Sequence, residues 1–166
     1  MKKGNIILIG MPGSGKTTIG TELSEKIGYG YIDSDSVIVA REGMRLPQII
    51  EAKGREGFLD IEAKVNSELC ADRCVIATGG SVIYRASAME KLKTLGTIVY
   101  LKLSYETIAS RLGDLKARGV ALKDGFTLKD LYEERTPLYE KYADLAISIQ
   151  CGNTIRQSVN NIKRYL

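Results

Sequence analysis

The chain has 166 residues, of which 24 are Lys or Arg and 20 are Asp or Glu, so its formal net charge is +4. Hydrophobic residues make up 44%, a share typical of globular domains, which excludes a disordered or collagen-like chain. No apolar segment approaches the roughly 20 residues that span a bilayer, and the aliphatic stretch after Met1-Lys2-Lys3-Gly4 is too short for a signal peptide. The positive charge is spread along the chain, which argues against nucleic-acid or membrane partners. We therefore expect a cytoplasmic protein.

The composition also limits the chemistry. The chain contains no His, which excludes imidazole bases and His-bound metals. Its three cysteines, Cys70, Cys74 and Cys151, form no Cys-x-x-Cys pair. We expect them to be reduced, half-buried side chains.

Short aliphatic segments alternate with helical patterns along the whole chain. This alternation predicts repeated βα units, an α/β fold and a parallel sheet. The first segment, Ile6-Ile7-Leu8-Ile9, is continuously apolar, as expected of a strand buried on both faces. The other strands are expected at 29–32, 74–78, 97–103 and around 145–149. The chain has no internal repeats or linkers, so residues 1–166 are predicted to form a single domain.

The helices are expected between these strands. The repeat of Ile19, Leu23 and Ile27 indicates the first helix, which Gly28 ends. In chain order, the others are a helix starting near Pro47, a longer helix with Phe58, Ile61, Val65 and Leu69 on one face, a short helix with a capping box of Ser87 and Glu90, a helix from Ser104 to about Leu112, a helix from about Thr127, and a last helix carrying Ile155, Val159, Ile162 and Leu166. The stretch 113–125 has no periodicity and contains three glycines among charged residues, so we interpret it as a mobile flap.

The segment from Gly10 to Thr17 carries a phosphate-binding motif. It reads Gly-Met-Pro-Gly-Ser-Gly-Lys-Thr and fits Gly-x-x-x-x-Gly-Lys-Ser/Thr. Glycines let backbone amides turn toward phosphate oxygens, and the following helix adds the positive end of its dipole. A glycine-rich turn with an accidental lysine is the alternative, but the motif lies between a buried-type strand and an amphipathic helix. We predict that Lys16 neutralises the β- and γ-phosphates of a nucleoside triphosphate and that Thr17 ligates Mg²⁺.

Two carboxylates follow the second predicted strand. Asp33 and Asp35 flank Ser34, and the carboxyl ends of parallel strands face the ligand crevice of an open sheet. One carboxylate can therefore support Mg²⁺ while the other accepts a hydroxyl proton. The alternative is a pair of turn or capping residues that open a helix at Ser36. Together with the phosphate-binding motif, the pair favours a hydroxyl group as phosphoryl acceptor.

Further candidates lie at the same edge of the predicted sheet. Gly79-Gly80-Ser81 follows the third strand and would let a substrate approach the backbone, although a flexible βα turn fits equally well. Arg118 lies in the flap, where a cation can stabilise charge on the transferring group. Arg111, near a helix end, fits dipole compensation equally well, and Arg135 precedes Thr136-Pro137-Leu138-Tyr139. For each arginine, a solvated surface role is the alternative.

Together these residues resemble the shikimate kinase family, within the nucleoside monophosphate kinase-like P-loop proteins. The similarity runs nearly end to end, and it is carried by residues 10–18, Asp33-Ser34-Asp35, Phe58 with Glu62, Gly79-Gly80, Arg118, and Arg135-Thr136-Pro137-Leu138-Tyr139. The resemblance implies a P-loop kinase fold, a three-layer sandwich whose five-stranded parallel sheet is flanked by helices. It also implies a mobile lid at about 113–125, an acceptor-binding region at about 33–62, and MgATP-dependent phosphorylation of a ring hydroxyl of shikimate.

The resemblance assigns roles to individual residues. Asp33 would hold Mg²⁺ through water, Asp35 would receive the acceptor hydroxyl, and Lys16, Asp35 and Arg118 would be catalytic. The acceptor would also meet Phe58, Gly79, the backbone of Gly80, Ser81, and Arg135, which would pair with its carboxylate. ATP would be bound by Gly10, Gly13, Ser14, Gly15, Lys16, Thr17, Thr18, Arg111 and Arg118.

The chain departs from the family pattern on the acceptor and lid side. The family reads Gly-Glu-x-x-Phe-Arg-x-x-Glu where residues 54–62 read Gly-Arg-Glu-Gly-Phe-Leu-Asp-Ile-Glu. The arginine that would help to clamp the substrate carboxylate is thus Leu59, and Arg55 replaces a glutamate. Ser81 replaces the third glycine of a Gly-Gly-Gly turn, and Gly119 replaces the proline after the lid arginine.

Two hypotheses follow from these departures. In the first, Arg55 lies one helical turn before Leu59 and replaces the missing clamp, so that the acceptor is still shikimate. In the second, Leu59 and Ser81 have remade the pocket for a less acidic or differently shaped hydroxyl compound, such as a polyol or hydroxy acid. Gly57 argues against a rigid helix between Arg55 and Leu59, which favours the second hypothesis slightly.

Other function classes make different demands on the sequence. A nucleoside monophosphate kinase would share the phosphate-binding motif, but a phosphate acceptor gains nothing from a neighbouring carboxylate. A non-catalytic ATP-binding module would not need Asp35, and a nucleic-acid-binding NTPase would need a basic stripe with stacking aromatics. The expected partners are therefore ATP and a small hydroxyl compound, and we favour a monomer.

Overall fold

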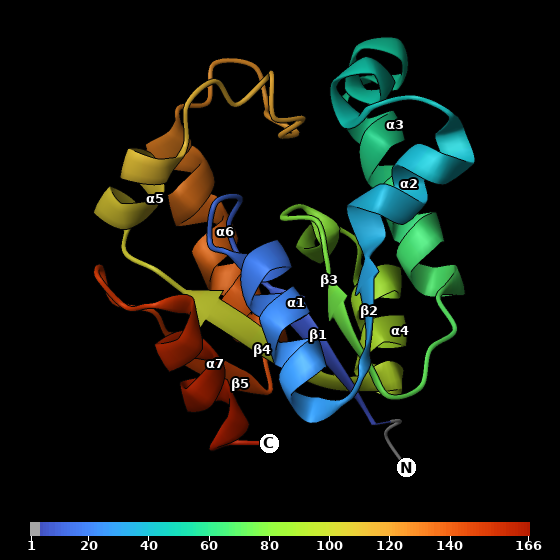
Figure 1. Cartoon of the computed structure of the whole chain (residues 1–166). Helices are drawn as coiled ribbons and strands as arrows, with labels where there is room; N and C mark the ends of the chain where they lie inside the picture. The colour runs from blue at the N-terminus through green and yellow to red at the C-terminus, as the bar shows by residue number, and fades with distance from the viewer. Residues whose placement is uncertain (1–3) are drawn as a thin grey trace.

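One sheet of five parallel strands organises the chain in this computed structural model, which describes residues 4–166 (Figure 1). The strand order is β2-β3-β1-β4-β5. The strands are β1 (Asn5–Ile9), β2 (Gly30–Asp33), β3 (Cys74–Ala77), β4 (Gly96–Lys102) and β5 (Leu145–Ser148). All five predicted strands are therefore confirmed. The first three residues, part of the segment weighed above for a targeting signal, lie outside the described residues.

The central strand is buried because it has neighbours on both edges and helices on both faces. All five residues of β1 are buried, and Ile7 pairs in register with Ile76 of β3 and Ile98 of β4. This environment explains why its sequence is continuously apolar rather than alternating. The connection that leaves β1 runs toward β2, and the connection that leaves β3 runs in the opposite direction, toward β4. A crevice therefore forms beyond the carboxyl ends of β1 and β3.

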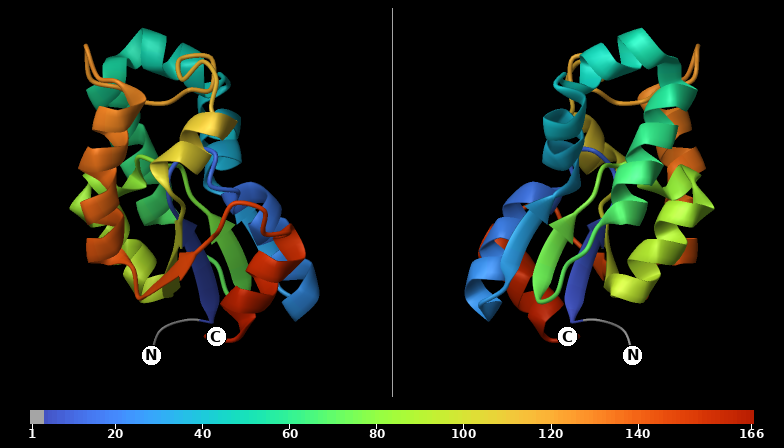
Figure 2. Two further views of the ribbon diagram at one scale, coloured as in Figure 1. Left: turned by 90° about the vertical axis from the view of Figure 1, so that its left-hand side faces the viewer. Right: turned by 90° about the vertical axis from the view of Figure 1, so that its right-hand side faces the viewer.

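The helices form two layers around the sheet. They are α1 (Lys16–Ile27), α2 (Ser34–Glu42), α3 (Leu46–Glu68), the 3₁₀ turn η1 (Val82–Tyr84), α4 (Ala86–Leu95), α5 (Tyr105–Arg111), α6 (Leu128–Tyr142) and α7 (Ile155–Lys163). Helices α1 and α7 pack together on one face, while α4, α6 and the second half of α3 cover the other (Figure 2). The predicted three-layer α/β sandwich is confirmed. No helix within residues 4–166 is long and apolar enough to cross a membrane.

A second, smaller hydrophobic cluster lies beyond the carboxyl edge of the sheet. It is built from Ile38, Ile49, Phe58, Leu59, Val65 and Ala121. These residues come from α2, α3 and the loop between α5 and α6. The cluster therefore packs the segment predicted to bind the acceptor against the segment predicted to be the flap.

Several local predictions are wrong. Ser87 does not cap α4, because the helix begins one residue earlier, at Ala86, with Arg85 at the N-cap. The break in α3 lies at Gly54, with φ 71° and ψ 176°, and not at Gly57. The last helix buries Val159 and Ile162 but leaves Ile155 exposed, and it ends at Lys163, before the exposed Leu166. Among the cysteines, which are all free, Cys70 and Cys151 are exposed rather than half-buried.

Candidate active site

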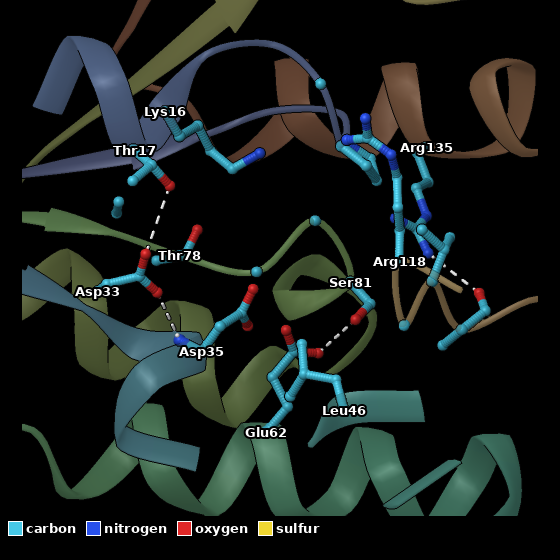
Figure 3. A pocket seen from close by; sticks show the side chains of 18 of the residues that line it. Lys16, Thr17, Asp33, Asp35, Leu46, Glu62, Thr78, Ser81, Arg118 and Arg135 are labelled. Atoms are coloured by element: carbon cyan, nitrogen blue, oxygen red, sulfur yellow. Dashed lines mark hydrogen bonds between the residues drawn. The ribbon is translucent and has the colours of Figure 1, made fainter. Parts of the chain in front are cut away.

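A cavity of about 410 Å³ lies at the carboxyl edge of the sheet, and we call it the central cavity. Its walls come from the loop after β1, the ends of β2 and β3, the middle of α3, the flap and α6. Thirteen of the predicted site residues line it: Gly13, Gly15, Lys16, Thr17, Thr18, Asp33, Asp35, Phe58, Gly79, Gly80, Ser81, Arg118 and Arg135. Segments that are far apart in the sequence thus converge on one volume (Figure 3).

The loop from Gly10 to Gly15 leads into α1, and its backbone at Gly13 and Gly15 lines the central cavity. Gly13 and Gly15 adopt φ values of 77° and 93°, which residues other than glycine rarely adopt. Gly15 is the N-cap of α1, and no side chain caps the helix start. The amides and the helix dipole are therefore available to an anion at this end of the cavity.

Lys16 lies at the floor of this loop. It is 9% exposed, and its Nζ donates to the carbonyl oxygens of Gly10 and Met11 at 2.8 and 2.9 Å. Burial lowers its pKa to about 8, although the negative charge of Asp35 opposes that shift. The ammonium group is thus held beside the loop where phosphate oxygens would bind.

Asp33 both caps a helix and contacts the phosphate-binding motif. One oxygen, Oδ1, accepts from the backbone amides of Asp35 and Ser36 at 3.0 and 3.3 Å, so that Asp33 caps α2. The other oxygen, Oδ2, accepts from the Thr17 hydroxyl at 3.3 Å (Figure 3). A capped helix start therefore directs one carboxylate oxygen toward the phosphate-binding loop.

The neighbouring Asp35 is half-buried, and one of its carboxylate oxygens is buried without a partner. Its Oδ1 forms no hydrogen bond with the protein, although the side chain lines the central cavity. Burial and the negative charge of Asp33 raise its pKa to about 6, although the positive charge of Lys16 opposes the shift. A free acceptor oxygen in this position can take a proton from a bound hydroxyl group.

Glu62 brings a second buried carboxylate to the same wall. It is 1% exposed; its Oε2 accepts from the Ser81 hydroxyl at 2.5 Å, and its Oε1 has no partner. Burial raises its pKa to about 8. In Figure 3 the Glu62 and Asp35 side chains approach the same part of the cavity. Sequence reasoning noted Glu62 only as part of the resemblance; its position four residues after Phe58 on one helix was the available signal.

These two carboxylates lie directly against the backbone of Gly79, which follows β3. A Cβ atom at this position would contact Glu62 Oε1 and would lie 2.7 Å from Asp35 Oδ1. The neighbouring Gly80 is equally restricted, because a Cβ atom there would lie 2.9 Å from Arg135 Nη1 and 2.9 Å from Pro12 Cδ. The two glycines are therefore required by the close approach of charged side chains to the turn.

Arg135 places a buried cation at the far end of the cavity. It is 1% exposed; its Nε donates to the Tyr84 hydroxyl at 3.2 Å and its Nη2 to the carbonyl oxygen of Ala121 at 3.1 Å. No carboxylate pairs with it among residues 4–166. Tyr139, from the same helix, donates to the carbonyl oxygen of Gly80 at 2.6 Å. Sequence reasoning missed Tyr84, and it noted Tyr139 only next to Arg135.

The flap lies against the start of α3. A Cβ atom at Gly119, which has a φ of 72°, would lie 2.6 Å from Leu46 Cβ. Arg118 Nη2 donates to the carbonyl oxygen of Arg111 at 3.3 Å, and Arg111 Nη1 donates to that of Gly13 at 3.2 Å. Arg111 and Ser14 line a smaller cavity of about 250 Å³ on the α7 side of the phosphate-binding loop. Gly10 lines neither cavity.

The two departures in α3 lie away from the central cavity. Leu59 is 1% exposed within the second hydrophobic cluster. Arg55 follows the break at Gly54 and lines a separate cavity of about 1020 Å³ between the start of α3 and the flap, which we call the outer cavity. Its guanidinium pairs with Glu56 at 2.6 Å and packs over the Tyr84 ring, 4.9 Å from the centroid.

The donor set beside the phosphate-binding loop suits Mg²⁺ better than a softer metal. The Thr17 hydroxyl and Asp33 Oδ2 are adjacent oxygens at 3.3 Å. No group of three or more His, Cys, Asp or Glu side chains that could hold a metal occurs within the described part of the chain. Mg²⁺ takes few protein ligands and completes its shell with water and substrate phosphates. The two oxygens therefore fit a metal that arrives with a nucleotide.

Comparison with known proteins gives one consistent family. Residues 12–166 match the family described as "Shikimate kinase". A shikimate kinase of Nostoc punctiforme is 40% identical over 162 residues, covering 95% of this chain and 88% of that protein. One of Thiobacillus denitrificans is 36% identical over 169 residues, covering 99% and 89%. The structure of a shikimate kinase from Acinetobacter baumannii in complex with shikimate is similar with a TM-score of 0.89, at 34% identity over 98% of this chain and 92% of that one. With a buried lysine, two carboxylates and an arginine converging on one cavity, the chain belongs to the shikimate kinase family.

Proposed function

We propose that the protein transfers the γ-phosphoryl group of ATP to a ring hydroxyl of shikimate. The observation that carries this proposal is the arrangement of three charged groups along one cavity: the buried Lys16 at the phosphate-binding loop, Asp35 with a free oxygen in the middle, and the buried Arg135 at the far end. This order matches a phosphoryl donor, a reacting hydroxyl and a carboxylate on the same small acceptor. The names of the relatives support the same substrate.

Each group has a defined part in the transfer. The acceptor hydroxyl oxygen attacks the γ-phosphorus, its proton passes to Asp35, and ADP leaves. Lys16 and the amides of the phosphate-binding loop stabilise charge on the phosphoryl oxygens. Mg²⁺, held by Thr17 and by Asp33 through water, would neutralise charge on the β- and γ-phosphates when it is bound. Arg118 approaches the same phosphates from the flap.

The acceptor would lie between the aspartates and α6. Arg135 bonds Tyr84 through Nε and Ala121 through Nη2, and its third nitrogen, Nη1, lies next to Gly80 at the cavity wall. A guanidinium nitrogen of this kind binds a carboxylate. Phe58, Gly79, the Gly80 backbone and Ser81 would contact the ring and its hydroxyls. We assign residues 33–62 to acceptor binding and 113–125 to a lid within a single domain.

A second acceptor class is favoured by one observation. Leu59 offers no charge to the cavity, and Arg55 lines the outer cavity instead of the central one. One guanidinium alone can bind a less acidic polyol or hydroxy acid. Shikimate remains the leading candidate because near-full-length relatives carry that name.

The test is ADP release by the purified protein with MgATP, with and without shikimate up to several millimolar. Saturable stimulation supports the proposal. Absence of stimulation, with ATP binding verified separately, would contradict it and would lead to a screen of polyols and hydroxy acids. Every wall of the cavity comes from one chain, so we expect the monomer, isolated by gel filtration, to be active.

A further inference from the structure

Two arginines share one tyrosine ring beside the central cavity. The Arg55 Cζ lies 4.9 Å from the centroid of the Tyr84 ring, and the Arg135 Cζ lies 5.3 Å from the same centroid. Arg55 belongs to the outer cavity and Arg135 to the central cavity. Among the described residues, the Tyr84 ring in the η1 turn is therefore the one aromatic ring that both guanidinium groups contact.

The Tyr84 hydroxyl group also has protein partners, which hold it by hydrogen bonds. Its Oη accepts from Arg135 Nε at 3.2 Å and donates to Glu134 Oε1 at 2.7 Å. Glu134 is held in turn by Lys123 of the flap, whose Nζ lies 2.7 Å from Oε2. The position of the Tyr84 ring therefore determines where the Arg135 guanidinium points.

The charges around the ring are unequal. Arg55 is paired with Glu56, whose side chain is 68% exposed, so this pairing is screened by water. Arg135 is buried and has no carboxylate partner in the part of the chain that the structure describes. Because a buried cation without a partner is unfavourable, this end of the cavity favours an added anion.

We propose that Arg55 is a positioning residue for acceptor binding, which acts through the Tyr84 ring on Arg135 and does not touch the acceptor. The inference rests on the proposed function, because Arg135 is there assigned to the acceptor carboxylate. Attraction between the Arg55 guanidinium and the ring face holds Tyr84 in place. Tyr84 then holds Arg135 Nε, while Nη1 lies beside Gly80 at the wall of the central cavity.

The experiment compares four single variants and one double variant by steady-state kinetics with shikimate and ATP varied separately. Arg55→Met removes the cation but keeps side-chain length, and Arg55→Lys keeps the cation. Tyr84→Leu removes the ring, and Arg55→Met combined with Tyr84→Leu completes a double-mutant cycle. Lys53→Met is the matched control, because Lys53 lines the outer cavity but, within residues 4–166, forms no cation–π contact or hydrogen bond with Tyr84.

We expect Arg55→Met to raise the KM for shikimate by roughly 3- to 10-fold, the size of a partly buried cation–π contact. The KM for ATP and kcat should remain within about twofold, since no contact with the nucleotide side changes. Arg55→Lys should restore much of the shikimate affinity, Lys53→Met should match the wild type, and Arg55→Met should have no further effect in the Tyr84→Leu background. An unchanged shikimate KM in Arg55→Met would overturn the inference, as would an increase that persists without Tyr84.

A second readout keeps the inference separate from the proposed function. The ¹⁵N NMR signal of Arg135 Nε–H reports its hydrogen bond to Tyr84 without turnover. We expect it to shift in Arg55→Met and to stay in place in Lys53→Met, with both variants folded by circular dichroism. If the wild type does not phosphorylate shikimate, the proposed function fails, while an unmoved Arg135 signal would refute the positioning role by itself.

Discussion

Ser81 Oγ donates a hydrogen bond to Glu62 Oε2 at 2.5 Å, and both side chains are buried in the wall of the central cavity. Ser81 occupies a position at which the family pattern has glycine. Glu62 forms no ion pair with a cation among residues 4–166, and its other oxygen has no hydrogen-bond partner. The Ser81 hydroxyl is therefore the one side-chain hydrogen-bond donor to this carboxyl group in the structure described.

Ser81→Ala should destabilise the fold by about 1–3 kcal/mol, because it leaves both oxygens of a buried carboxyl group without a partner. Urea unfolding measures the change. The control is Ser87→Ala in the same part of the chain, because Ser87 is exposed and does not cap α4; we expect a change within about 0.5 kcal/mol. Equal effects of the two substitutions would contradict the importance of the Ser81–Glu62 bond.

The stability of the protein should fall as pH rises from about 4.5 to about 8, because burial raises the pKa of Glu62 from 4.5 to about 8. In this range the folded state binds a proton at Glu62 that the unfolded state has released, so the free energy of unfolding decreases with pH. Glu62→Gln cannot titrate and should flatten this dependence. Melting temperatures of both proteins across the range provide the measurement. Asp35, whose pKa is raised to about 6, titrates in both proteins and cancels in the comparison; parallel curves would argue against a protonated Glu62.

Lys16→Ala should lower phosphoryl transfer to any acceptor by roughly 10²–10³-fold, since it removes a preorganised cation from the phosphate-binding loop. ADP release at saturating acceptor measures the loss. Lys26 lies in the last turn of the same helix and donates to Asn160 Oδ1 at 2.6 Å, so Lys26→Ala should retain full activity. Near wild-type turnover by Lys16→Ala would refute the assignment of the loop.

Asp35→Asn should lower kcat by roughly 10²–10⁴-fold while ATP binding is retained, because an amide cannot accept the acceptor proton. Calorimetry with a non-hydrolysable ATP analogue and steady-state turnover separate the two properties. Asp33→Asn is the comparison, because Asp33 caps α2 and contacts Thr17, and it should weaken nucleotide binding in the presence of Mg²⁺. Equal loss of binding and turnover in Asp35→Asn would point to a metal or structural role instead.

Gly79→Ala should reduce acceptor-dependent turnover by roughly 10- to 100-fold, because the added Cβ displaces Asp35 and Glu62. ATP binding should persist, since the phosphate-binding loop is not contacted. Gly4→Ala is the control, because a Cβ at Gly4 would lie 3.7 Å from the Tyr29 hydroxyl, an ordinary van der Waals contact. Wild-type kinetics in Gly79→Ala would show that the two carboxylates can move without loss of function.

The elements could be predicted where the signal is local. The five strands, the capped start of α6 at Thr127 and the end of α1 at Gly28 follow from side-chain periodicity and from capping residues a few positions away. Helix α4 was predicted to start from a capping box that does not form. Its backbone instead enters the helix directly from the η1 turn, and that geometry depends on packing against α3 rather than on residues 87–90.

The placement of Arg55 illustrates why the candidate site was harder to predict. Regular helical spacing would put Arg55 one turn before Leu59 on the same face. The break at Gly54 precedes both residues and leaves this spacing intact, but packing against η1 places Arg55 beside the Tyr84 ring. Leu59 meanwhile packs with Ala121 of the flap. Contacts between residues that are 29 or 62 positions apart in the chain cannot be deduced from spacing.

The amino-acid sequence by itself determined that a nucleotide-binding loop and an aspartate pair follow two buried strands, because the loop motif, the apolar segments and the turn residues act over a few neighbouring positions. Only the tertiary structure decided that Glu62 takes Ser81 as its partner, that Arg135 is buried beside Tyr84, and that Arg55 lies outside the central cavity. These contacts arise when α3, η1, the flap and α6 pack over the carboxyl edge of the sheet. Their energies depend on burial and on partners from distant segments, which local sequence does not specify.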